Sequence, residues 1–469
     1  MLKAIIKHLK SDERGISTVI VVMLSLILIV VIVSNVVLWS YQMNQFDWER
    51  MQEKIEIISV ESDSFAWYYQ NFNYRVQHNI TGSTAGSVTD YQVKITIING
   101  TGSSNGNTYY TTHISQSDFD DVRFTWYNSS SGMEQPISYW RESEYDGINA
   151  TFWIKVPKIP ANPNSATIYI YYGNSTATTL SNPKQTMFIY DDMKTPPDGI
   201  LDGSAHYDSA NKWVRLTQPA KNKLGHLYYL KNPGDGFVAK FEFWTGGGSG
   251  ADAVWLGVYD KSVSSTREDM VDGGYHFTFD EYQDRIAFTK STVDNGAPIA
   301  YAEESSIDNS QWHKVEIIHY GRTAEIFYDG LLKLNASDSV NIDKSGNYFS
   351  IGGRTGGLTN EHRVRNLVVR KYVHPEPSHG GWGTEETYSE SGGNANKLTL
   401  KLKNSCPLTV HIVSLWVIDN SLHKRYDVNI FVGSGETKSF SCQNVTLPKD
   451  GYIVKIVTDR GNIAVYLKD

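Results

Sequence analysis

The sequence predicts a mainly β fold: an N-terminal transmembrane α-helix followed by three β-sandwich domains. Three observations predict it. A long uncharged run lies near the N-terminus. Beyond residue 60, apolar residues alternate with polar ones, as at Val93, Ile95 and Ile97, which places apolar side chains on one face of a strand. Clusters of Gly, Asn, Ser and Pro separate these segments and predict turns between strands.

Length and charge limit the classes of function. The chain has 469 residues, enough for about three domains, and a formal net charge of −8. The first 15 residues carry four basic and two acidic side chains, so the remainder is more acidic still. An acidic chain argues against a nucleic-acid-binding protein, because phosphate backbones select basic surfaces. We therefore expect no nucleic-acid partner.

The uncharged run extends from Ile16 to Trp39. As a helix it would be roughly 36 Å long, enough to cross a hydrocarbon core of about 30 Å. Basic residues precede it, whereas Asp47 and Glu49 follow it. The positive-inside tendency predicts a single-pass protein of the cell membrane, with a cytoplasmic N-terminus and extracellular C-terminal domains.

The letters "ERG" directly before this run resemble the class III signal of archaeal pilins and archaellins. The resemblance implies cleavage between Gly15 and Ile16, which would remove a basic leader (residues 1–15) and retain the helix. The apolar pattern continues as "VVLWSYQMNQFDWERMQEKIEII", so we expect a transmembrane helix and helical stalk over residues 16–57. Ile20 stands where bacterial-type pilins carry a glutamate. The alternative is a plain anchor that is never cut.

Residues 60–185 form the first predicted sandwich. The segments "DYQV", "DVRF", "YW", "WIKVPKIP" and "IYIYYGN" occur there in this order. They resemble a domain of unknown function found in archaeal and some bacterial surface proteins. Members of that family usually precede a concanavalin-like domain, so the resemblance implies a cell-surface protein.

Residues 186–388 form the second predicted sandwich. "NSQWHKVEIIHYG" and "AEIFYDG" read as two adjacent strands that lead into an Asp329-Gly330 turn. This region resembles the concanavalin A-like jelly roll of lectins and laminin-G-like modules. Glucanases on that scaffold carry carboxylates at alternate residues of one strand, and no strand here shows that pattern. We therefore expect binding and no enzymatic activity, with a surface glycoside hydrolase as an alternative.

The segment "FDEYQD" resembles the start of the calcium-binding loop of lectins. The resemblance makes Asp280 and Asp284 candidate ligands of Ca²⁺, the only cofactor considered, although Ca²⁺ prefers six to eight oxygens. Trp255 and Tyr282 are candidate platforms for a sugar ring. The alternatives are an exposed acidic turn for the carboxylates and core packing for the aromatic rings.

Residues 395–469 contain at least six short strands and resemble the small immunoglobulin-like modules of archaeal membrane-anchored proteins. The two cysteines of the chain, Cys406 and Cys442, both lie there. In an exported module we expect them to form a disulfide; two buried free thiols are the alternative. Glycosylation sequons compatible with an extracellular location begin at Asn79, Asn99, Asn128, Asn149, Asn174, Asn335 and Asn444.

Together these features predict a membrane-anchored, adhesin-like surface glycoprotein of archaeal type. Its concanavalin-like domain would bind carbohydrate or another surface protein. One alternative is a structural pilin-like subunit that assembles with itself into a filament.

Overall fold

The computed structural model describes residues 13–63, 67–131, 133–262, 274–290, 298–388, 396–420, 422–445, 447–448 and 451–468. The fold is mainly β with an N-terminal apolar helix, as predicted. The chain divides into two compact units. One consists of Met1–Ala66 and Ser389–Asp469, and the other is Trp67–Tyr388.

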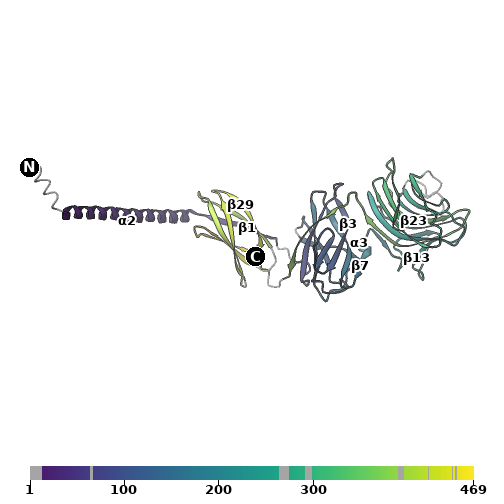
Figure 1. Ribbon diagram of the computed structural model, residues 1–469, viewed down its shortest axis with the longest axis horizontal. Coiled ribbons are helices and arrows are strands. Elements are labelled where there is room, and N and C mark those ends of the chain that lie inside the picture. Colours follow the sequence, from purple (N-terminus) through teal and green to yellow (C-terminus); the bar gives the residue numbers. More distant parts are fainter. Residues whose placement is uncertain are drawn as a thin grey trace, which may run out of the picture. The chain divides into compact units, whose positions relative to one another are not determined.

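The first unit contains helix α2, Glu13–Gln52 (Figure 1). It is the one helix in the described part of the chain that is long and apolar enough to cross a membrane. Its large apolar side chains from Val19 to Trp39 are all exposed. A helix of this length and composition could be a membrane span or a signal anchor. Gly15 and Ile16 belong to the first turns of α2, whereas residues 1–12 of the predicted leader lie outside the described residues.

The C-terminal module of this unit is a pair of sheets. One has the strand order β1-β26-β29 and the other β28-β27-β30-β31. The buried core between them includes Leu400, Leu415 and Ile456. The strands are β1 (Ile55–Asp63), β26 (Asn396–Asn404), β27 (Val410–Ile418), β28 (His423–Val432), β29 (Thr437–Val445), β30 (Tyr452–Thr458) and β31 (Ile463–Lys468).

Strand β1 corrects the predicted division of the chain. The predicted stalk extended to residue 57 and the first sandwich began at residue 60. In the structure the helix ends at Gln52, and the next residues pair with β26 in antiparallel register. Ile55 and Val60 are buried in the module core, so burial of one strand face outweighs continuation of the helix.

The first sandwich of the second unit consists of the sheets β25-β2-β9-β5-β6 and β4-β3-β8-β7. Ile95, Phe124 and Phe152 lie fully buried between them. The strands are β2 (Tyr74–Thr81), β3 (Val88–Asn99), β4 (Thr108–Thr111), β5 (Arg123–Asn128), β6 (Met133–Pro136), β7 (Tyr139–Tyr145), β8 (Asn149–Ile159), β9 (Ser165–Tyr172) and β25 (Ser378–Thr387). Because β25 pairs with β2, the last strand of the predicted 186–388 domain belongs to the first sandwich.

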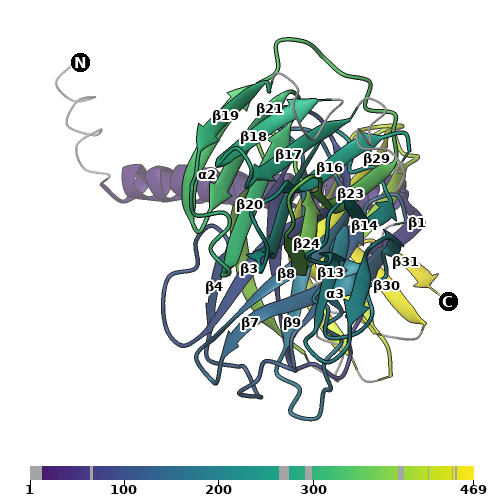
Figure 2. The same cartoon turned by 90° about the vertical axis from the view of Figure 1, so that its right-hand side faces the viewer.

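The second sandwich packs an eight-stranded sheet on a seven-stranded sheet. Figure 2 shows β14, β23, β16, β17, β18 and β19 side by side in the seven-stranded sheet. Asp329 and Gly330 both have positive φ, 47° and 81°, as the predicted two-residue hairpin turn requires. The eight-stranded sheet contains β10 (Ile189–Asp191), β12 (His206–Asp208), β13 (Trp213–Thr217), β15 (Gly236–Gly246), β20 (Trp312–Tyr320), β21 (Thr323–Tyr328), β22 (Leu331–Ser337) and β24 (Glu361–Lys371).

The remaining strands build the facing layer of this sandwich. They are β11 (Ile200–Gly203), β14 (Lys223–Leu230), β16 (Ala253–Asp260), β17 (Tyr275–Asp280), β18 (Arg285–Lys290), β19 (Ala300–Glu303) and β23 (Tyr348–Thr355). Phe237 from one sheet packs edge to face on Phe277 and Phe349 from the other.

Hydrogen bonds tie the two sandwiches together beside the short helix α3, Pro183–Thr186. Buried Gln92 donates to the carbonyl oxygen of Thr186 at 3.0 Å and accepts from the Lys371 amide at 2.9 Å. Glu376 accepts at 2.5 Å from the Tyr91 hydroxyl. These contacts fix the walls of the cavities described below.

Candidate functional site

The two aromatic candidates do not form a shared binding surface. Trp255, in β16, is 1% exposed, and its indole covers Gly352 so closely that a Cβ there would overlap the ring. The prediction that Trp255 stacks on a sugar is therefore wrong; it packs on its own sheet. Tyr282 is 62% exposed in the turn between β17 and β18.

Of the two carboxylates predicted to bind calcium, Asp280 already faces a cation. An oxygen of buried Asp280 lies 3.4 Å from Nε of Arg285. Neighbouring Asp252 lies 3.3 Å from Nε of Arg354. Asp284 is exposed in the turn. Among the described residues, no group of three or more His, Cys, Asp or Glu side chains lies in a metal-binding arrangement. This donor set does not fit Ca²⁺, because Arg285 already faces Asp280 and, among the described residues, Asp280 and Asp284 are not part of a group of three or more donor side chains.

A buried polar network lies next to this turn. Glu281 accepts hydrogen bonds from the Thr245 hydroxyl and, at 2.9 Å, from the Asn360 amide. Its other oxygen contacts Nε2 of His362. The Asn360 amide also lies 2.9 Å from Asp308. Every polar atom of the Glu281 carboxylate is thus engaged, and the network holds three loops together at one end of the sandwich.

The outer face of the eight-stranded sheet carries a cluster of tryptophan side chains. Trp213, Trp244 and Trp312 alternate with inward-facing residues of β13, β15 and β20, and each is partly exposed. The Trp213 and Trp312 ring centroids lie 5.8 Å apart, and Arg363 lies over the rings of both Trp213 and Trp244. We call this surface the tryptophan–arginine face; its members are Trp213, Trp244, Trp312, Arg363 and Arg365.

Two guanidinium groups of β24 lie among these indoles. The Arg363 Cζ lies 3.8 Å from the Trp244 centroid, and the Arg365 Cζ lies 4.0 Å from the Trp312 centroid. Arg365 also pairs with Glu242 at 2.8 Å. Glu242 lines an adjoining hollow of about 580 Å³ together with charged and amide side chains. The face therefore combines flat apolar rings with polar groups able to hydrogen-bond a hydroxylated ligand.

Sequence reasoning missed this face, although a signal was present. In each of the three strands the tryptophan is directly adjacent to an inward-facing residue, for example Val214 beside Trp213. Strict alternation places such a tryptophan on the outer face, where a large apolar ring is unusual.

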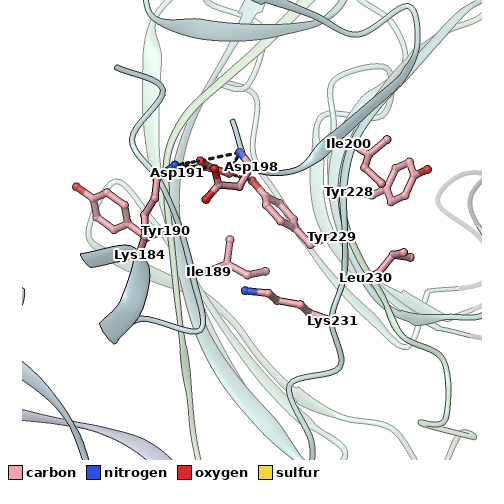
Figure 3. Close-up of a pocket in the computed structure, with 10 residues that line it drawn as sticks. All are labelled: Lys184, Ile189, Tyr190, Asp191, Asp198, Ile200, Tyr228, Tyr229, Leu230 and Lys231. Carbon is pink, nitrogen blue, oxygen red and sulfur yellow. Dashed lines mark hydrogen bonds and ion pairs between the residues drawn. The ribbon is translucent and has the colours of Figure 1, made fainter. Parts of the chain in front are cut away.

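A smaller cavity of about 210 Å³ lies between α3, β10, β11 and β14 (Figure 3). The buried Asp191 carboxylate accepts from the Tyr229 hydroxyl and from the Asp198 amide at 3.1 Å. Burial raises the pKa of Asp191 above its ordinary value. Lys184 donates to Asp198 at 2.7 Å, and Lys231 lies on the opposite side of the cavity, below Ile189 in Figure 3.

Cys406 and Cys442 do not form the predicted disulfide in the structure. Buried Cys406 follows β26, and its Sγ donates to the carbonyl oxygen of Leu408 at 3.2 Å. Cys442 lies within β29, where its register partner is Leu398. The two cysteines therefore occupy separate positions on neighbouring segments.

The predicted glycosylation sites differ in exposure. Asn335 is exposed, and Asn79, Asn99, Asn128 and Asn149 are partly exposed. Asn174 is buried, and its side-chain oxygen accepts from the Thr176 amide and hydroxyl at 3.0 and 2.9 Å. The prediction is thus contradicted at Asn174. The side chain of Asn444 lies outside the described residues.

Comparisons with known proteins match one segment of the chain to a family model. Residues 118–215 match the family model described as a domain of unknown function (DUF2341). No curated protein matches the chain. One similar solved structure is the Ca²⁺-bound exoplasmic/lumenal domain of VIP36, with 15% identity, a TM-score of 0.34, and coverage of 41% of this chain and 96% of that one.

Two further solved structures are similar. The carbohydrate recognition domain of Emp47p has 13% identity and a TM-score of 0.31, covering 39% of this chain and 95% of that one. The carbohydrate-binding module CBM66 from Bacillus subtilis has 18% identity and a TM-score of 0.25, covering 34% of this chain and 94% of that one.

Proposed function

We propose that the protein is a membrane-anchored, adhesin-like surface protein whose second sandwich binds carbohydrate. We assign the contact surface to the tryptophan–arginine face. The presence of three partly exposed indoles on one sheet face carries the proposal, because aromatic rings supply flat apolar area for the C–H face of a sugar. The flanking hollow supplies hydrogen-bonding groups that orient hydroxyls.

The anchor in this proposal is helix α2, with its N-terminus in the cytoplasm. Its exposed apolar surface and the basic residues before it support this arrangement. Many copies on one membrane would raise the effective concentration at each weak site. The proposal includes no catalytic activity: the most buried carboxylate of the turn, Glu281, is fully engaged with Thr245, Asn360 and His362.

The test uses the full chain in detergent micelles on a glycan array, followed by calorimetry with the best neutral glycan. Trp213→Ala combined with Trp312→Ala should weaken binding at least tenfold, about 1.4 kcal/mol. Tyr282→Ala is the matched control and should change binding less than about twofold, or about 0.4 kcal/mol. A folded protein that binds no glycan would overturn the proposal. Release of reducing sugar would overturn the absence of catalysis.

A filament subunit is the second candidate, and one observation favours it. Helix α2 runs without interruption from the apolar segment into contact with the C-terminal module, where Arg460 pairs with Glu49 and Glu53. An exposed apolar helix fixed to a folded module can pack against its copies. Filaments seen by electron microscopy of cells producing the chain, and absent without it, would support this candidate.

A further inference from the structure

Lysine side chains converge on a cavity at the junction of the two sandwiches. The cavity measures about 480 Å³, and its lining includes Lys155 of β8, Lys184 of α3, Lys231 after β14 and Lys371 at the end of β24. One carboxylate, that of Asp90, also lines it. This concentration of positive charge stands out in a chain whose net charge is −8.

Among the described residues, three of these four ammonium groups have no carboxylate within ion-pair distance. Lys231 donates to the carbonyl oxygen of Phe188 at 2.7 Å, and Lys371 donates to that of Thr89 at 2.9 Å. Both partners are neutral. Within the described part of the chain, the Lys155 ammonium makes no hydrogen bond or ion pair in the structure. Only Lys184 pairs with carboxylates, Asp198 at 2.7 Å and Asp191 at 3.9 Å.

The environment of Lys231 compensates its charge only in part. Partial burial lowers the pKa of Lys231 below its ordinary value; the Asp198 and Asp191 carboxylates offset part of this, and the nearby Lys155 lowers the pKa further. A bound anion would offset both effects, since it replaces lost solvation and screens the repulsion between ammonium groups.

The cavity walls are held in place before any ligand binds. Gln92, which is 2% exposed, lines the cavity and bonds to Thr186 and Lys371 across the junction. The hydrogen bonds to the carbonyl oxygens of Phe188 and Thr89 likewise hold the side chains of Lys231 and Lys371 in place. Binding would therefore require little ordering of side chains.

From these observations we propose that the cavity binds the anionic group of an acidic sugar residue, a carboxylate, sulfate or phosphate. Lysine ammonium groups act as compact positive charges for such groups. Phe188 and Met187 add apolar surface to the lining, and Ser138 and Gln185 add hydrogen-bonding groups, which suits a charged sugar better than a bare ion. The cavity shares no lining residue with the tryptophan–arginine face, so this proposal does not depend on that face.

Calorimetry on the full chain in micelles tests the proposal with a sulfated polysaccharide (heparin), a polyuronate (alginate) and neutral dextran. Heparin or alginate should bind, dextran should not compete, and inorganic sulfate should displace the bound polymer. Lys155→Gln and Lys231→Gln should each weaken binding at least fivefold. The loss of affinity caused by each substitution should become smaller when the salt concentration rises from about 0.05 to about 0.5 M, because the Debye length shortens.

Lys221→Gln is the matched control, an exposed lysine outside the cavity lining, and should leave binding within twofold. Equal loss in Lys221→Gln and the cavity variants would indicate a general charge effect and overturn the site. So would acidic-polymer binding that is insensitive to Lys155→Gln and Lys231→Gln but lost in the double tryptophan variant; that result would leave the proposed function intact.

Discussion

Arg460 Nη1 lies 3.3 Å from an oxygen of Glu53, whose side chain is completely buried. The same carboxylate accepts from the Thr458 hydroxyl at 2.7 Å and from the Asn462 amide at 2.8 Å. Asn462 also donates at 2.7 Å to the carbonyl oxygen of Arg50, one of the last carbonyls of α2. The loop between β30 and β31 thus caps the C-terminus of α2 through Asn462, and its Arg460 neutralises the charge of Glu53.

We expect Arg460→Ala to destabilise the C-terminal module by roughly 2–4 kcal/mol, because it leaves the buried Glu53 carboxylate without its cation. Hydrogen exchange of the β30 and β31 amides, followed by mass spectrometry, measures the change. The control is Arg425→Ala, which breaks an exposed pair with Asp427 and should cost less than about 0.5 kcal/mol. Equal exchange in both variants would contradict the capping role.

The thiols provide the second prediction. Under denaturing, non-reducing conditions both Cys406 and Cys442 should react fully with an alkylating agent. In the native protein buried Cys406 should be protected. Burial raises the pKa of the Cys442 thiol, so its native alkylation rate should keep rising at pH values where a free cysteine has levelled off. A cross-linked peptide containing both residues would show that they form a disulfide and would contradict this prediction.

The third prediction concerns processing. If a pilin-type peptidase recognises "ERG", mass spectrometry of the native protein should find Ile16 as the first residue. Gly15→Leu should then leave the leader attached and increase the mass accordingly. An intact Met1 or Leu2 in the native protein would establish a simple anchor instead.

Local sequence patterns could predict individual strands and turns, but not which strands pair with each other in every case. The alternation at Val93, Ile95 and Ile97 and the Asp329-Gly330 turn are properties of short segments, and the structure confirms both. The partners of β1 and β25 are remote in sequence, β26 and β2 respectively. Such pairing depends on which surfaces are buried in the whole fold, which a single segment does not encode.

The same limit explains why the sequence alone could not predict the candidate site correctly. Alternation assigns Trp255 to a sheet face but does not reveal that Gly352 lies opposite and receives its ring. It likewise does not reveal that Arg285 faces the candidate calcium ligand Asp280. The four lysines of the cavity come from four segments between residues 155 and 371, so only the folded chain brings their charges together.

The last prediction concerns acid stability. Burial lowers the pKa of His226 from 6.5 to about 4, and that of His78 and His319 to about 3. Folding therefore favours the neutral imidazoles, whereas the unfolded chain takes up protons below pH 6.5. Their contribution to stability is complete above about pH 6.5 and is progressively lost as the pH falls toward 4.

Each such histidine should contribute a slope of up to about 1.4 kcal/mol per pH unit in this window. His226 is the best probe, because it is fully buried and neither ring nitrogen has a hydrogen-bond partner in the described part of the chain. His226→Leu should flatten the dependence of the unfolding free energy on pH between 6 and 4. His206→Leu, at an exposed position of the same sandwich, should leave the slope unchanged. Denaturant unfolding at several pH values measures both, and an unchanged slope in His226→Leu would show that this imidazole does not drive the acid sensitivity.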